Sequence, residues 1–487
     1  MNHGTCLWMC FMLAAAPITA QYATPEAPTP QGVSNILGAG ARALGMGGAF
    51  TAIADDATAA SWNPAGLAQI SKPEITIVFD SFSASQETDW IYDRDYDAGL
   101  SYEGTPYSAD GRMEYSQVGF AGFSFPVISS ARTWTLQVSY RRLSTFPSFT
   151  QGWYEEWILR DENEGGTVLL DEFVSKEIAT DTGGGIYDFA FSVAVDLFPN
   201  LKAGITANYL DADVSHRTEF IAQESYYDVP TGDVFQYDEV RRDSFRYAFS
   251  GITLDYGLLW TPLEHFALGA VYHSSFTADL DYWAATELRA TQGGLNLPRL
   301  SMAGTSRMRW PDGWAVGLAV RPNTAVTLAV DYSVTAWSRA VVDEVRTAEY
   351  GFLDEVGEWT PEIVTWTDAP FPYLTAGRQE DSSSLRAGAE YVWISPGGLA
   401  VPVRAGWSRE KQIVSFWRAG GLPVVHSIAL GTGLTYGNVQ LDLAWSHSRC
   451  TDSGEALRQG EGYSDDLLGE QKTTTNRVMF SMMYRFE

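Results

Sequence analysis

The chain has 487 residues and a formal net charge of −28, from 60 acidic and 32 basic side chains. This balance excludes a nucleic-acid partner, because a phosphate backbone requires a basic surface. Charged residues make up only 19% of the chain and aromatic residues 13%, which excludes a disordered acidic protein. After residue 20, no apolar run approaches the roughly 18 residues of a membrane helix. A large all-β protein and a membrane β-barrel remain.

The N-terminal segment has the pattern of a secretory signal peptide. Residues 6–16 form an apolar run, and small residues continue from it to Ala20. We therefore expect a signal peptide at residues 1–20, although His3 is the only potential cation before the run. A buried N-terminal helix is the alternative. Cleavage near Ala20 leaves Cys450 as the only cysteine, so we expect no internal disulfide.

Alternation of apolar and polar residues predicts fourteen strands after this segment. They span residues 74–84, 113–126, 132–144, 185–198, 201–213, 246–260, 265–283, 310–321, 324–337, 384–394, 400–409, 424–436, 438–448 and 476–486.

The connections between these strands alternate between short and long. The short ones are turns of two to four residues such as Pro199-Asn200 and Gly437-Asn438. The long ones, which we expect to be external loops, carry nearly all of the excess negative charge. They include residues 85–112, 145–184, 214–245, 338–383 and 449–475. Short turns at one end and long loops at the other are typical of an outer-membrane barrel, and a soluble sandwich has no reason to sort them.

The strand pattern also indicates which face meets lipid. In residues 326–334 the apolar side chains share one parity, and Asp331 falls on the other. Asp188, Asp196 and Asp442 fall on the polar parity of their own strands in the same way. A charge that faces lipid at the bilayer midplane costs about 2–4 kcal/mol for Arg or Lys and less for Asp or Glu. The pattern therefore predicts an apolar outer wall and a wetter lumen.

Residues 24–73 do not continue the strand pattern. A proline-rich leader at residues 24–30 is followed by small residues at 38–56 and by Trp-Asn-Pro-Ala-Gly-Leu at 62–67. Glycines in the second stretch match a dinucleotide-binding pattern, but no strand precedes them, as a βαβ unit would require. The composition instead indicates a compact segment of the size needed to plug the lumen of a fourteen-stranded barrel.

This segment resembles the N-terminal hatch of the FadL-type transporters, which carry long-chain fatty acids and hydrocarbons through Gram-negative outer membranes. The resemblance rests on residues 45–56 and on Asn63-Pro64-Ala65, which matches the NPA motif of that family. Other matching stretches follow in the same order along the chain. They are residues 268–276, 311–318, 331–332, 337–338 and 385–391. Residues 45–50 are also similar to the related PorV-like proteins, which serve protein secretion.

The resemblance implies an all-β fold, a fourteen-stranded antiparallel transmembrane β-barrel at residues 74–487. A leader and hatch at residues 21–73 would plug its lumen. It further implies a monomer in the cell outer membrane that takes up a hydrophobic molecule, a fatty acid or a hydrocarbon, without catalysis and without a cofactor. Outer-membrane lipid and lipopolysaccharide are the other expected partners. The alternative function is a PorV-like scaffold for protein secretion.

The resemblance also implies roles for hatch residues. Asn63, Pro64 and Ala65 would line or gate the ligand pocket, and a plain Asn-Pro turn is the alternative. Asp55 and Asp56 would anchor the hatch to Arg or Lys side chains on the inner wall, with a solvated turn as the alternative.

The third predicted strand lacks residues that would kink it. In FadL-type proteins a kink in this strand opens a lateral exit, but residues 132–144 contain no glycine or proline. The sequence therefore does not predict that exit here.

Five tryptophans near predicted strand ends are expected to anchor the barrel at the lipid headgroups. They are Trp260, Trp310, Trp337, Trp393 and Trp445. A hydrolase would need a Ser–His pair on the outer wall, and the strand parity offers none.

Overall fold

A computed structural model describes residues 38–487 except 97–99, 105–106, 129–131, 145–147, 162–166, 229, 231, 291–299, 344–345, 354–358, 367–379, 413–421 and 461–462. The expected signal peptide and the proline-rich leader lie outside the described residues.

Three short helices precede the first strand, and strands form nearly all of the remaining described chain. The helices are α2 (Ala41–Gly45), η1 (Ala57–Ser61) and η2 (Pro64–Gln69), and a further short helix, η4 (Trp337–Arg339), lies between strands. The strands are β1 (Glu74–Tyr96), β2 (Leu100–Gly104), β3 (Tyr107–Ile128), β4 (Thr133–Ser144), β5 (Ser148–Asp161), β6 (Thr167–Phe198), β7 (Leu201–Asp228), β8 (Asp233–Leu263), β9 (Phe266–His273), β10 (Phe276–Ala290), β11 (Leu300–Trp310), β12 (Gly313–Asn323), β13 (Val326–Thr335), β14 (Val341–Asp343), β15 (Arg346–Leu353), β16 (Trp359–Trp366), β17 (Ser382–Ile394), β18 (Ala400–Lys411), β19 (Val424–Tyr436), β20 (Val439–Gly460) and β21 (Tyr463–Arg485).

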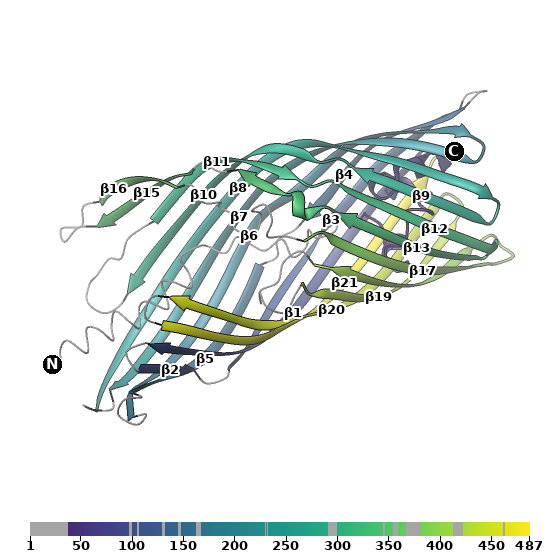
Figure 1. The fold of residues 1–487 in the computed structure, drawn as a ribbon. Helices are drawn as coiled ribbons and strands as arrows, with labels where there is room; N and C mark the ends of the chain where they lie inside the picture. The colour runs from purple at the N-terminus through teal and green to yellow at the C-terminus, as the bar shows by residue number, and fades with distance from the viewer. Residues whose placement is uncertain are drawn as a thin grey trace.

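Within the described chain, fourteen strands close into one antiparallel barrel (Figure 1). The ring runs through β1, β3, β4, β6, β7, β8, β9, β12, β13, β17, β18, β19, β20 and β21. It closes where β21 pairs with β1, from Glu74 opposite Arg485 to Tyr96 opposite Tyr463. Closure leaves this ring without an edge, so backbone groups that would face hydrocarbon are paired. The fold class expected from the sequence is confirmed.

No helix among the described residues is long and apolar enough to cross a bilayer.

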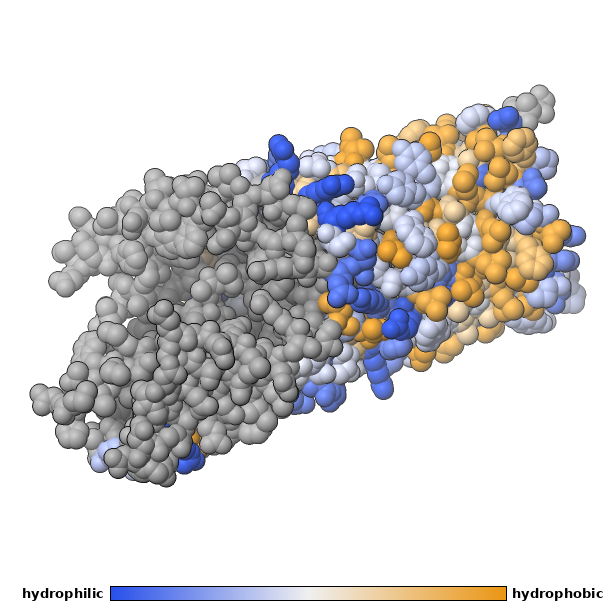
Figure 2. Space-filling view, in the orientation of Figure 1, coloured by the Kyte–Doolittle hydropathy of each residue, from blue (hydrophilic) through white to orange (hydrophobic). Residues whose placement is uncertain are grey.

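The expected sorting of side chains is confirmed on several strands. On β13, Leu328 and Val330 are 45% and 47% exposed, while Ala329 and Asp331, which alternate with them, are 3% and 1% exposed. Asp188 and Asp442 are also buried on the lumen side. Figure 2 shows the exposed apolar residues gathered in a belt at the end with the tight turns, bordered by a hydrophilic band. This belt is the surface expected to meet lipid.

The long connections differ from their expected form, because strands continue far into them. β6 begins at Thr167, and β7 and β8 form one hairpin that reaches Asp228 and Asp233. Apolar alternation is absent where both faces of a strand meet water. The sequence pattern therefore did not predict these parts of the strands, although backbone pairing continues through them. Charged cross-strand pairs such as Arg246 with Asp213, 2.7 Å apart, stabilise the extension.

The expectation of a headgroup anchor is wrong for two of the five tryptophans, Trp310 and Trp337. Trp260 and Trp393 are 45% and 51% exposed on the outer wall, as headgroup anchors should be, and Trp445 is exposed too. Trp337 is instead 2% exposed and packs against Trp310, with ring centroids 5.4 Å apart. Both indoles are packed against each other at the wall, Trp310 at the end of β11 and Trp337 in η4.

Candidate functional site

The hatch, which we define as residues 38–73, lies inside the barrel with its backbone close to glycines of the wall. A Cβ added to Gly406 would lie 2.0 Å from the backbone nitrogen of Gly47, and one added to Gly388 would lie 2.3 Å from the Met46 carbonyl oxygen. The wall glycines that meet the hatch in this way are Gly204, Gly257, Gly269, Gly317, Gly388, Gly406 and Gly431. Strand glycines of this kind permit close backbone approach, so they set how deeply the hatch can sit.

Asn63 organises the start of η2 and connects it to the wall. Its side-chain oxygen accepts a hydrogen bond from the Ala65 backbone N–H at 3.1 Å, which makes it the N-cap. Its side-chain nitrogen donates to the carbonyl of Thr51 at 2.9 Å and to that of Leu258, in β8, at 3.0 Å. Asn63 is fully buried, and both the oxygen and the nitrogen of its side-chain amide are hydrogen-bonded.

Pro64 and Ala65 lie between Asn63 and two neighbouring wall strands. Proline at the first helical position has no backbone N–H to leave unpaired. Both residues pack against Gly204 of β7 and Gly257 of β8, where an added Cβ would overlap them. The three residues of the motif are therefore the place where η2 contacts the wall.

A wall carboxylate holds a second part of the hatch. Asp331 of β13 accepts hydrogen bonds from the backbone N–H groups of Phe50 at 2.8 Å and Thr51 at 2.7 Å. A buried carboxylate that accepts backbone N–H bonds is strongly held in place. The inward aspartate that the strand parity identified is thus a hatch contact.

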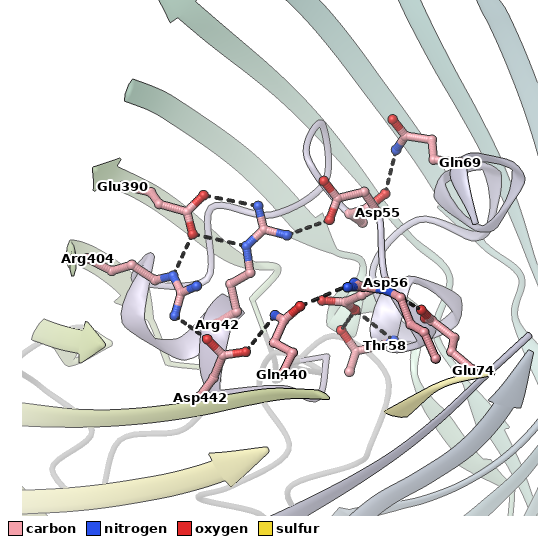
Figure 3. A network of polar contacts seen from close by, with 12 residues as sticks. Arg42, Asp55, Asp56, Thr58, Gln69, Glu74, Glu390, Arg404, Gln440 and Asp442 are labelled. Atoms are coloured by element: carbon pink, nitrogen blue, oxygen red, sulfur yellow. Dashed lines mark hydrogen bonds and ion pairs between the residues drawn. The ribbon is translucent and has the colours of Figure 1, made fainter. Parts of the chain in front are cut away.

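Arg42 of α2 makes an ionic contact between hatch and wall (Figure 3). Its guanidinium donates two hydrogen bonds of 3.1 Å to Glu390 of β17 and forms an ion pair with Asp55. Glu390 also accepts from Arg404 of β18 at 2.6 Å, and Arg404 donates to Asp442 of β20 at 2.7 Å. Burial alone would lower the pKa of the Arg42 guanidinium, but Asp55 and Glu390 raise it well above its usual value. Arg42 is therefore a permanent cation between carboxylates of both parts.

The network continues around the wall to the first strand. Gln440 donates to Asp442 at 2.8 Å and accepts from Arg485 at 3.2 Å, and Arg485 donates to Glu74 at 3.3 Å. Gln440 and Asp442 lie in β20 and Glu74 lies in β1 (Figure 3), and Arg485 is the last residue of β21. One chain of contacts thus joins the hatch to the closure of the barrel.

Asp55 and Asp56 are placed differently from the sequence expectation. The partner of Asp55 is Arg42, which belongs to the hatch and not to the wall. Asp56 caps η1 by accepting from the Thr58 backbone N–H at 2.9 Å. Burial raises the pKa of the Asp56 carboxyl, and Arg42 and the Thr58 hydrogen bonds offset only part of that effect. The hatch contributes the arginine and the wall contributes the carboxylate, the reverse of the anticipated arrangement.

An apolar layer lines the wall beyond the hatch. On β7 the inward positions change from Gly204, beside the hatch, to Leu210 and Ala212 farther along. The layer is a cluster of buried wall side chains that contains no hatch residue. It comprises Ile186, Leu210, Ala212, Phe249, Phe276, Ala278, Leu280 and Met308, with Leu143, Tyr247 and Trp310 packed against it.

Aromatic rings extend this layer toward the outside of the barrel. Phe249 contacts Phe276 with centroids 6.4 Å apart, Phe276 stacks on Trp310 at 5.9 Å, and Trp310 contacts Trp337 of η4. The rings come from β8, β10, β11 and η4, so the layer runs from the lumen to the wall at η4.

Three neighbouring strands are interrupted at the same height beside η4. β9 gives way to β10 after His273, β12 follows β11 from Gly313, and β13 ends at Thr335. His273, Gly313 and Thr335 lie side by side in the ladder. Figure 1 shows η4 at this place as a short green coil. The expected third strand is instead continuously paired on both sides, from Trp134 to Tyr140 of β4.

Residues around η4 hold the interruption closed. Arg339 donates two hydrogen bonds of 3.0 Å to Asp312, which lies between β11 and β12. The backbone N–H of Ser338 donates to Asp381, just before β17, at 3.0 Å. Trp337 is thereby held in the wall with its indole buried.

Comparison with solved structures places this geometry in a known fold. The toluene transporter TodX of Pseudomonas putida matches with a TM-score of 0.54 at 14% identity, over 93% of this chain and 100% of that chain. The toluene transporter TbuX of Ralstonia pickettii matches with 0.51 at 15%, over 93% and 100%. The chain has the FadL-type fold. A FadL homologue of Pseudomonas aeruginosa matches with 0.50 at 14% identity, over 92% of this chain and 99% of that chain.

No family model matches the chain, and no curated protein matches its sequence. The chain therefore shares the FadL-type fold with these solved structures but little of their sequence.

Sequence reasoning missed the residues that attach the hatch. Arg42 lies in a stretch of glycine and alanine with no charge pattern around it. Glu390 and Arg404 are single charged residues in strands whose apolar and polar residues alternate in the usual way. One signal was present: charged residues at Glu390, Arg404 and Asp442 all fall on the lumen parity of strands that face lipid. Charges on adjacent inner positions must find partners, and this could have pointed to a network there.

Proposed function

We propose that the protein carries hydrophobic small molecules across the outer membrane, through a lumen that the hatch closes. The observation that carries the proposal is the buried apolar and aromatic layer directly beyond the hatch, inside a barrel whose outer face is apolar. The solved structures with this fold include two toluene transporters, which supports a hydrophobic substrate. Hydrocarbons and long-chain fatty acids are both within the proposal, with the protein acting as a monomer.

We also propose that gating depends on how the hatch is held. Asn63, Pro64 and Ala65 would fix η2 against the wall, while Asp55 and Asp56 would support Arg42 and η1 from within the hatch. The hatch meets the wall through short contacts to glycines and a few polar bonds, and it also packs against apolar wall residues such as Ala194, Leu259 and Phe120. Release of the hatch as a unit would have to break these contacts together.

The transport proposal predicts that a charge in the apolar layer blocks uptake. Leu280 is 2% exposed in this layer, so Leu280→Asp places a carboxylate where the substrate would bind. Burying an unpaired polar group costs about 1–3 kcal/mol, and we expect uptake to fall about tenfold. Labelled toluene and labelled oleate, tested separately in cells that express the barrel, measure the effect. The neighbouring Asp279 is exposed on the outer face, and Asp279→Asn is the matched control.

Equal uptake by the Leu280→Asp variant and the wild-type protein would remove the apolar layer from the transport route. Mass spectrometry of lipids and hydrocarbons that co-purify in mild detergent provides an independent measurement. A stable co-purifying protein, together with a lumen free of any hydrophobic molecule, would favour the secretion scaffold instead.

The interruption beside η4 supports a lateral route for the substrate. The apolar layer leads to it through Phe276 and Trp310, and the Trp337 indole fills it. Trp337→Ala should therefore raise uptake severalfold, provided that the variant still migrates as a folded barrel in unheated gels. Trp283→Ala is the control, because Trp283 is 40% exposed on the outer wall. Unchanged uptake in a folded Trp337→Ala protein would exclude this route.

A further inference from the structure

A row of basic side chains crosses three neighbouring strands on the outer face of the barrel. Arg409 of β18 lies directly opposite His426 of β19, and His426 lies directly opposite Arg449 of β20. All three side chains are exposed and share the parity of outward residues such as Trp407 and Ile428, which are 38% and 53% exposed. We call these three residues the basic row.

The basic row has no carboxylate partner among the described residues. Arg449 donates to the ring of His447 at 3.1 Å. The residues that flank the row in the ladder are uncharged, Leu385 beside Arg409 and Thr474 beside Arg449.

Two nearby lysines on the same face do have carboxylate partners. Lys411 is paired with Glu380 at 2.5 Å, and Lys472 is paired with Glu470 at 2.8 Å. Arg409 and Arg449 both lie directly opposite His426, so their positive charges are two strand spacings, about 10 Å, apart on one face. An unpaired row of this kind, in a chain with a net charge of −28, indicates that an anion from outside the protein completes it.

The height of the row identifies where this anion would be. Arg449 lies about eleven residues beyond the tight turn between β19 and β20, or roughly 36 Å along the strand. With the usual strand tilt of about 40°, this corresponds to roughly 28 Å of height, close to the apolar band of about 25 Å in outer-membrane barrels. The turn end is the periplasmic end in such barrels, so the row lies at the outer headgroup level.

The residues below the row would face acyl chains. Trp407, Ile428, Leu430 and Trp445 form an exposed apolar surface on the same three strands. Arginine at this depth extends to the interface and binds phosphate through two parallel hydrogen bonds. The combination of a basic row above and an apolar surface below matches one lipid molecule with a phosphate headgroup.

We propose that Arg409, His426 and Arg449 bind the phosphate of a lipid in the outer leaflet, lipopolysaccharide in an outer membrane, whose acyl chains lie along the apolar surface. This inference rests on the proposed placement in the outer membrane. The site is on the outside of the wall and separate from the hatch and the apolar layer.

The test compares the full-length barrel in detergent with its Arg409→Gln/Arg449→Gln double variant. The probe is purified lipopolysaccharide, and the readout is the temperature at which the folded band is lost in gels. Wild-type protein should be stabilised by lipopolysaccharide, and the double variant should need roughly tenfold more of it for the same shift. Inorganic phosphate and dephosphorylated lipopolysaccharide should leave the wild-type temperature unchanged.

Two control variants separate charge from folding. Arg246→Gln removes an exposed outward arginine that is paired with Asp213, and it should keep the full shift. Arg409→Lys/Arg449→Lys keeps the charge and should keep part of the shift. The inference is overturned if the double glutamine variant responds like wild type, or if inorganic phosphate gives the same shift.

Uptake of labelled toluene and oleate, measured on the same variants, keeps this inference distinct from transport. A lost lipid shift with normal uptake supports the lipid site. A normal lipid shift in a wild-type protein that takes up neither probe rejects transport and still supports the lipid site.

Discussion

Replacing Arg42 by methionine should unseat the hatch. The substitution removes both hydrogen bonds to Glu390, which is 5% exposed, and the ion pair with Asp55. Glu390 and Asp442 would then share Arg404, so the expected cost is about 3 kcal/mol, the low end for breaking a buried ion pair from one side. At about 1.4 kcal/mol per tenfold change, the unseated hatch should become about a hundredfold more populated. Single-channel conductance in planar bilayers measures this as a higher frequency of large openings.

Matched variants identify which carboxylate matters. Arg42→Met/Glu390→Gln should recover part of the loss, since the stranded charge is neutralised while Arg404 keeps its contact with Asp442. Asp55 is 34% exposed, so Asp55→Asn should change the openings little. If Arg42→Met conducts like the wild type, Arg42 does not hold the hatch.

Replacing Asn63 by aspartate should disturb the hatch at least as much as replacing it by alanine. Aspartate and asparagine are about equally good N-caps, so a plain Asn-Pro turn would tolerate Asn63→Asp. In this structure the side-chain nitrogen donates to the carbonyls of Thr51 and Leu258. A carboxylate would turn both bonds into contacts between oxygens, at a buried site where an unmade bond costs about 1–3 kcal/mol.

Protease cleavage of the hatch in the folded barrel, and conductance, measure this effect. Asn63→Ala should increase cleavage roughly tenfold or more, because three hydrogen bonds are lost. Asn63→Asp should increase it by as much or more. An aspartate variant with wild-type cleavage would show that the residue acts only as a helix cap.

Much of the barrel could be predicted from particular residues. Alternation around Asp331 and Asp442 gave the correct inner and outer faces, because lipid excludes charge from one side of each strand. The hatch was predicted from its small residues and from Asn63-Pro64-Ala65. Strand ends failed wherever both faces meet water, as in the hairpin of β7 and β8, since the apolar signal disappears while backbone pairing continues.

Residue patterns alone predict which side of each strand faces lipid, how many strands close the barrel and that a glycine-rich segment precedes them. These are local properties, visible in strand alternation and turn composition. How the hatch is attached is seen only in the folded barrel. Arg42 meets Glu390 across 348 positions of the chain, and Gly47 lies directly against Gly406 of the wall. Such contacts depend on which inner positions reach the same height when the barrel closes. Local sequence patterns do not contain this information.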